Sequence, residues 1–209
     1  MSISLAPSIR LQVAQRSACG LVGMLLLLSG CGSAPPEHFY TLEPSAALTA
    51  ADGRPAYSVS VGAVTLPEAV DRAQMVVRMG SNQVNQIEDR RWAESLRFAI
   101  PRVVSDDLGR YLPSAAVSVR SDAAVESTIK YRVAIDILRF ESRLSDGITL
   151  AARWRIQGPG QIARSAAAEF TEAAGPGDYD ALAAAHGRAL ARLSQDIAKA
   201  LRALEAGRP

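Results

Sequence analysis

The stretch IKYRVAIDILRFESRLSDGITLAARWRI, residues 129–156, decides the fold. Apolar side chains alternate with polar or small ones on both sides of Asp146-Gly147, a dipeptide that favours a tight hairpin turn. The alternating apolar positions are Ile129, Tyr131, Val133, Ile135, Ile137, Ile148, Leu150, Ala152, Trp154 and Ile156. A period of two places all of them on one face, so the stretch predicts two antiparallel strands with one buried face.

The sequence after this stretch extends the pattern. Gly158-Pro159-Gly160 predicts a turn, and residues 162–171 can form a third strand of an antiparallel meander. Gly175-Pro176-Gly177 then breaks the chain, and Asp178 can cap a long amphipathic helix that ends near Gly207. The apolar face of that helix carries Leu182, His186, Ala189, Leu190, Leu193, Ile197, Leu201 and Leu204.

The sequence before this stretch predicts short strands and one more helix. Residues 59–64 and 75–79 are β runs, and residues 83–87 can return as a hairpin partner after a turn at 80–82. Trp92 to Leu112 has helical spacing, although Pro101 must either kink the helix or begin its main body. Val117 and Val119 suggest a further short strand.

The expected fold class is therefore α+β. We expect a two-layer domain with a mostly antiparallel sheet and two main helices packed on one face of it.

The N-terminal segment resembles the signal of a bacterial lipoprotein. Arg10 and Arg16 supply its positive end, and an apolar core of about ten residues is too short to span a bilayer. Leu28-Ser29-Gly30-Cys31 resembles a lipobox, in which the cysteine receives diacylglycerol and, after cleavage, an N-acyl chain. We expect a signal peptide at 1–30, a lipidated tether at 31–38 and a single periplasmic domain at 39–209. A plain signal peptide without lipidation is the nearest alternative.

Charge and cysteine content exclude several classes of function. The formal net charge of +2 corresponds to Arg10 and Arg16, so the chain beyond residue 30 is formally neutral. Such a balance gives no reason to expect a nucleic-acid partner. Cys19 lies in the expected signal and Cys31 would carry lipid, which leaves the domain without a disulfide.

Catalytic and metal-binding patterns are not found. The only histidines are His38, in the tether, and His186, on the apolar face of the last helix, where a structural role is favoured. The sequence has no metal-ligand spacing and no phosphate-binding or dinucleotide-binding loop. Asp106-Asp107 fits a solvated helix face better than an acid–base pair. We expect no enzymatic activity and no cofactor other than the acyl groups at Cys31.

Two local clusters stand out as structural or partner-docking motifs. The first contains Asp71, Arg72 and Gln74, between two short strands. Asp71 and Arg72 can form an ordinary loop salt bridge or present a polar docking edge. The second contains Arg91, Trp92 and Glu94. There Trp92 can anchor a helix start, and Glu94 can complement the positive N-terminus of that helix.

These residues carry a family resemblance. Phe39-Tyr40-Thr41-Leu42 after the lipobox, the Val-x-Val-x-x-Val-x-Leu-Pro pattern at 59–67, Asp71-Arg72-x-Gln74 and Arg91-Trp92-Ala93-Glu94 resemble the ABC-type transport auxiliary lipoproteins, of which PqiC (YmbA) is the best-known type. The resemblance implies a compact α/β domain with helices on one sheet face. It also places Arg91 to Glu94 at a helix start.

The resemblance further implies a partner function. Such lipoproteins face the periplasm from the outer membrane and work with an inner-membrane-anchored MCE-domain protein and an ABC transporter in lipid transport or envelope integrity. Gly32 after the cysteine favours sorting to the outer membrane. A homo-oligomer is possible. One alternative is a lipid-binding carrier with its own apolar cavity, and another is an envelope enzyme with an unrecognised site.

Overall fold

The predicted meander is present and forms the long part of the sheet. Its strands are β6 (Tyr131–Arg143), β7 (Gly147–Gly158) and β8 (Gln161–Glu172), paired antiparallel in that order. The structure is a computed structural model that describes residues 35–44, 56–112, 115–119, 129–159 and 161–207. The alternating apolar residues of β6 and β7 are buried on one face, as the pattern predicts.

Strand β6 joins the meander to the other strands. Its first half pairs in parallel with β2 (Tyr57–Thr65), and β2 pairs in parallel with β5 (Ala115–Val119). Near its end, β6 contacts β3 (Gln74–Arg78) through the pair Val77 and Ser142.

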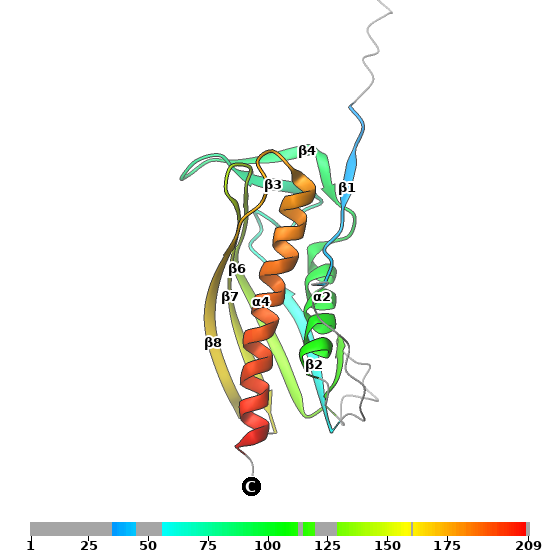
Figure 1. Cartoon of the computed structure of the whole chain (residues 1–209), viewed down its shortest axis with the longest axis vertical. Helices are drawn as coiled ribbons and strands as arrows, with labels where there is room; N and C mark the ends of the chain where they lie inside the picture. Colours follow the sequence, from blue (N-terminus) through cyan, green and yellow to red (C-terminus); the bar gives the residue numbers. More distant parts are fainter. Residues whose placement is uncertain (1–34, 45–55, 113–114, 120–128, 160, 208–209) are drawn as a thin grey trace, which may run out of the picture. The chain divides into compact units, whose positions relative to one another are not determined.

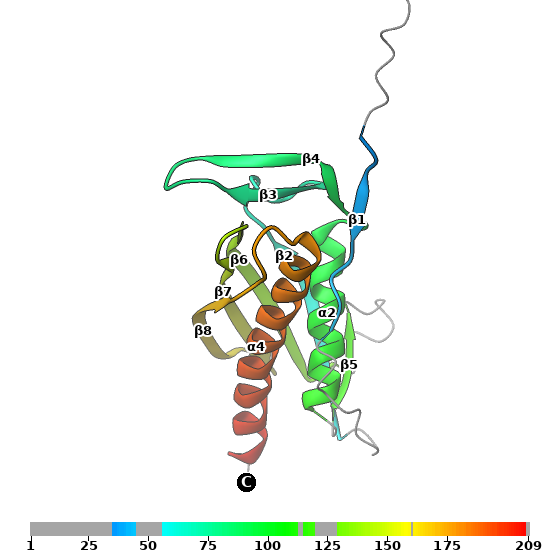
Figure 2. The same ribbon diagram turned by 45° about the horizontal axis from the view of Figure 1, so that its top comes forward.

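Strand β3 forms an antiparallel hairpin with β4 (Val84–Trp92), and β1 (His38–Tyr40) adds in parallel to the end of β4. Figure 2 shows this hairpin lying across the upper end of the meander, with β1 beside β4. The eight strands form a mixed sheet, and the α+β class is confirmed. Alternation predicts which face a residue occupies but not which strand lies beside it, so the parallel pairings were not foreseen.

The two helices of the described residues cover the same face of the sheet (Figure 1). Helix α4 (Tyr179–Ala206) packs on β7 and β8, and helix α2 (Leu96–Tyr111) packs on β2 and β5. The Asp178 carboxylate caps α4 by accepting hydrogen bonds from the amides of Asp180 and Ala181, at 2.9 and 3.2 Å. No helix in the described part of the chain is long and apolar enough to cross a membrane.

Helix α2 begins later than predicted. Trp92 is the last residue of β4, so the prediction that it anchors a helix start is wrong, and the helix begins at Leu96. Tryptophan fits a strand at least as well as a helix, and the ladder with β3 decides the outcome. Pro101 lies inside the helix rather than at its first position. Asp107 is fully buried, which contradicts the expected solvated face for this residue.

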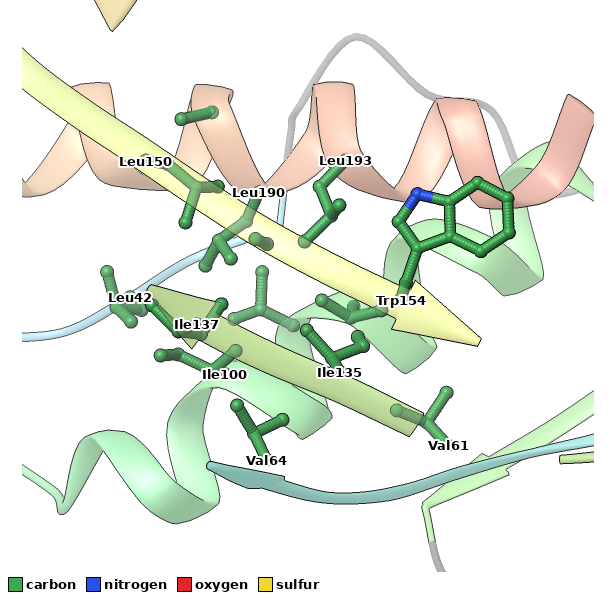
Figure 3. Close-up of a cluster of buried hydrophobic side chains, with 14 of the residues drawn as sticks. Leu42, Val61, Val64, Ile100, Ile135, Ile137, Leu150, Trp154, Leu190 and Leu193 are labelled. Atoms are coloured by element: carbon green, nitrogen blue, oxygen red, sulfur yellow. The ribbon is translucent and has the colours of Figure 1, made fainter. Parts of the chain in front are cut away.

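The core lies between the helix layer and the sheet. Figure 3 shows side chains from α4, α2, β2, β6 and β7 filling this space, together with Leu42 from the segment after β1. Leu42, Ile100, Leu150, Leu190 and Leu193 are each at most 1 % exposed. Burying side chains of this size contributes about 1.5–3 kcal/mol each, so the interlayer core is the main source of stability. The expected signal peptide and Cys31 lie outside the described residues.

Candidate functional site

Strand β1 is held at the edge of the sheet by the residues of the second sequence cluster. His38, Phe39 and Tyr40 pair in register with Arg90, Arg91 and Trp92. Beyond the ladder, the Ala93 amide donates to the Tyr40 carbonyl at 2.8 Å, and Arg91 Nη1 donates to Glu37 Oε1 at 2.6 Å. The chain from the expected anchor therefore enters the domain beside β4. We call the surrounding region, residues 37–43, 66–74 and 89–102, the N-terminal junction.

The first sequence cluster forms the loop between β2 and β3. Asp71 Oδ2 accepts a hydrogen bond of 2.6 Å from Arg97 Nε, in the first turn of α2. Arg72 donates to the Glu68 carbonyl at 3.3 Å, and its Nε is a buried atom without a partner in the described structure. Asp71 therefore pairs with the helix rather than with the neighbouring Arg72, and the loop is tied to the start of α2.

Gln74 and Glu94 add links on either side of this loop. Gln74 Nε2 donates to Glu88 Oε2 at 3.2 Å across the β3–β4 hairpin. Glu94 pairs with Arg102, whose Nη2 also donates to the Leu42 carbonyl at 3.0 Å. Glu94 precedes the helix by two residues, and it pairs with this arginine about one and a half turns into α2. The pair connects the helix to the chain that follows β1.

Trp92 is the apolar centre of the junction. Its backbone amide donates to the Ala73 carbonyl at 2.7 Å, and its side chain is 7 % exposed. The indole packs edge-on against His186 at 5.8 Å between ring centroids and tilted against Phe140 at 6.4 Å. Trp92 thus holds the end of β4 against α4 and β6, instead of anchoring the start of a helix.

His186 is a buried neutral side chain rather than an exposed base. It stacks on Phe140 at 4.0 Å, and its Nε2 lies 2.9 Å from Ser142 Oγ. Burial lowers the pKa of His186 to about 3, because the interior does not solvate the charged imidazolium. The adjacent cavity, lined by residues that include Trp92 and Leu96, measures about 10 Å³. That volume is at the lower limit for one water molecule, so no substrate fits beside this histidine.

Helix α4 closes the junction from the other side. Gly187 approaches the chain so closely that a Cβ at that position would lie 2.7 Å from the Glu43 carbonyl oxygen. Tyr179, in the first turn of α4, packs on Tyr40 at 6.3 Å and lies under the Arg90 guanidinium at 5.3 Å. The segment after β1 is therefore enclosed between α2 and α4.

A second feature lies between the β3–β4 hairpin and β6 and shares Pro67, Ala69 and Val70 with the junction. A β-bulge between Ile137 and Arg139 turns Leu138 outward, where it is 44 % exposed. Leu138 and Val84 line a small groove of about 70 Å³ whose other walls are largely apolar. The walls are Pro67, Ala69, Val70, Val76, Arg78, Arg139, Phe140 and Glu141. We call this space the hairpin groove.

One carboxylate organises the charged rim of the hairpin groove. Glu141 accepts hydrogen bonds from Arg78 at 2.6 and 2.8 Å and from Arg139 at 3.0 Å. The bidentate bonds from Arg78, with the second arginine, lower the pKa of Glu141 to about 2. The rim is thus an ionised network that holds the hairpin against β6.

All six predicted motif residues lie in the junction, and sequence reasoning missed most of their partners. Glu37, Arg97 and Arg102 are isolated charges in the sequence, and nothing local indicates which side chain each one meets. Gly187 gave a usable signal, because a glycine inside a strong helical pattern points to a close approach. The bulge was also signalled, since the apolar positions change phase between Ile137 and Phe140.

Comparison of the sequence with known protein families gives the class of this protein. The chain belongs to the family of ABC-type transport auxiliary lipoprotein components, whose sequence model matches residues 40–198. The expected family resemblance is therefore confirmed, and membership makes the protein an envelope lipoprotein with an auxiliary role in ABC-type transport.

Solved structures agree on the fold. The chain is similar to an uncharacterized protein, with a TM-score of 0.64, 16 % identity and coverage of 80 % of this chain and 99 % of the other. It is also similar to protein XCC0632 from Xanthomonas campestris, with a TM-score of 0.57, 18 % identity and coverage of 77 % and 91 %. No curated protein matches the chain.

Proposed function

We propose that the protein is an outer-membrane-anchored lipoprotein, held by acyl chains on Cys31, that docks a periplasm-spanning partner of an intermembrane lipid transport system. The partner is an MCE-domain protein anchored in the inner membrane and coupled to an ABC transporter. The family supports the auxiliary role. The observation that carries the docking part is the hairpin groove, an apolar recess with an ionised rim beside the entry of the anchored chain.

The hairpin groove suits one side chain of a protein partner better than a small ligand. Ligand pockets usually measure about 300–1,000 Å³, whereas this groove measures about 70 Å³. Val84 and Leu138 are exposed at its mouth, so a partner that inserts one apolar side chain would cover both. The Arg78–Glu141 pair keeps the walls in place without the partner.

Site-specific crosslinking in the envelope tests this docking. A photoreactive residue at Val84 should capture the MCE-domain partner, and one at Val119, which is similarly exposed on β5, should not. Recovery of the partner equally from both positions, or from neither, would contradict docking at the groove. Fractionation of the same cells shows whether the protein is in the outer membrane.

The role of the anchor has its own test. The Cys31→Ala form should fold and remain soluble in the periplasm but lose its role in transport. Full function of that soluble form refutes the requirement for an anchor.

A lipid carrier with its own cavity is the second candidate, and the interlayer packing argues against it. Leu182, Leu190 and Ile197 of α4 are fully buried against the sheet, and the cavity near Trp92 and His186 is only about 10 Å³. A larger open hollow of about 530 Å³ lies over β2, β6 and β7 at Gly62, Arg132 and Arg155, outside the space between helices and sheet. Native mass spectrometry of the delipidated domain separates the candidates. Bound phospholipid would favour the carrier.

A further inference from the structure

The two most exposed large apolar side chains of the described structure both belong to the N-terminal junction. Phe98 is 73 % exposed and Phe39 is 62 % exposed. Single exposed apolar residues are common and need no explanation. Two exposed phenylalanines in one region leave a larger apolar surface in contact with water, which is unfavourable. The other exposed large apolar side chains in the described ranges are Met79, Val84, Val119 and Leu138.

The backbone fixes both phenylalanines in place. Phe39 is the central residue of β1, in register with Arg91 of β4. Phe98 lies in the first turn of α2, where its amide donates to the Ser95 carbonyl at 2.9 Å. Trp92 is the register partner of Tyr40, and helix α2 starts four residues after Trp92. Phe39 and Phe98 therefore lie at the same end of the domain.

Each phenylalanine has a salt-bridged arginine as its neighbour. Arg91 lies beside Phe39 in the ladder and pairs with Glu37, and Arg97 precedes Phe98 and pairs with Asp71. Aromatic rings accompanied by long cationic side chains suit the boundary between lipid headgroups and acyl chains, because the ring is buried while the charge stays at the polar surface. The Phe39–Phe98 surface therefore has the chemistry of a membrane contact.

The length of the chain points to the same occupant. Phe39 follows Cys31 by eight residues, which reach at most about 28 Å when fully extended. This step rests on the proposed function, because it takes Cys31 as the acylated residue. An anchor in the bilayer then keeps Phe39 within that distance of the lipid surface. A protein partner has the hairpin groove, whose exposed residues Val84 and Leu138 lie outside the junction.

We propose that Phe39 and Phe98 insert into the headgroup boundary of the membrane that holds the anchor. The acyl chains supply the affinity, and the two rings orient the domain, which a short tether alone leaves free to rotate. With the junction against the bilayer, the hairpin groove has one defined height and direction relative to the membrane. The Phe39–Phe98 surface is thus a positioning device for the docking reaction.

Fluorescence of a single introduced tryptophan tests the contact. The lipidated full chain carrying Phe98→Trp is reconstituted into phosphatidylethanolamine–phosphatidylglycerol vesicles with and without brominated acyl chains. The matched control is Val119→Trp, an exposed position on β5, and the parent gives the background of the buried Trp92 and Trp154. Phe39→Trp is the second probe should Phe98→Trp fail to fold.

We expect the brominated lipids to quench Phe98→Trp at least about twofold more than Val119→Trp, with a blue-shifted emission only for the former. Equal quenching at both positions in a lipidated chain overturns the membrane contact and leaves the anchor intact. The mass of the purified chain reports lipidation separately. A chain without the acyl mass overturns the anchor and, with it, the reach argument on which the contact depends.

Discussion

The body of the domain and the N-terminal junction are held together by different means. In the body, α4 lies on the meander through fully buried side chains such as Leu190 and Leu193. In the junction, short polar links dominate, among them Arg91 with Glu37 and Arg102 with the Leu42 carbonyl. Apolar burial contributes more than half-exposed ion pairs do. The body therefore supplies stability, and the junction supplies a defined attachment of β1.

The largest effect is expected from a cavity in the body. Leu190→Ala removes a side chain that is 0 % exposed between α4 and the sheet, and it should lower the free energy of unfolding by about 2–5 kcal/mol. Urea denaturation of the domain measures this. If Leu190→Ala lowers the free energy of unfolding no more than the loss of a junction ion pair does, the body does not contribute more to stability than the junction.

Acid should act on the junction through His186. The pKa of His186 is lowered from 6.5 to about 3 in the folded chain. Between these two pH values the unfolded chain binds a proton at this histidine and the folded chain does not. The free energy of unfolding should therefore fall as the pH falls from 6.5, by up to about 1.4 kcal/mol per pH unit. The range from pH 7 to 5 lies above the window of Glu141, whose lowered pKa contributes stability that is lost as the pH falls from about 4.5 to about 2.

Unfolding of His186→Gln between pH 7 and pH 5 measures this contribution. The variant should lose less stability on acidification than the parent. Leu190→Ala, which keeps His186, should follow the slope of the parent. Equal slopes for His186→Gln and the parent would show that the buried imidazole does not titrate in this way.

Two glycine substitutions in helices should have opposite signs. Gly187→Ala places a methyl group 2.7 Å from the Glu43 carbonyl oxygen and should destabilise by about 1–3 kcal/mol. Gly109→Ala, in α2, meets no atom within 4 Å and should stabilise by about 0.5–1 kcal/mol. Thermal unfolding compares the two variants. Stabilisation by Gly187→Ala would mean that α4 does not close on the segment after β1.

The smallest effect is expected at the exposed ion pair. The Arg91 and Glu37 side chains are 30 % and 46 % exposed, so Arg91→Gln should cost less than about 1 kcal/mol in global stability. Hydrogen exchange of the Ala93 amide, which donates to Tyr40, should nevertheless become faster. Unchanged exchange would mean that the ladder alone holds β1.

The sequence predicted local elements well and long-range partners poorly. The alternation in residues 131–156 and the cap at Asp178 specify strands and a helix start by local chemistry alone. The parallel pairing of β2 with β6 and the burial of Asp107 depend on contacts distant in the chain. For the same reason the motif residues could be predicted as a group, while their partners could not.

The close approach of Gly187 to Glu43 also bears on the order of folding. These residues are about 140 positions apart, and loops of that length close late and slowly. A chain that crosses a membrane from its N-terminus, as the proposed lipoprotein does, delivers Leu42 and Glu43 before α4, which encloses them. If Cys31 carries the proposed anchor, the segment that follows it stays accessible to processing enzymes until α4 docks, and lipid attachment can precede the enclosure of Leu42 and Glu43.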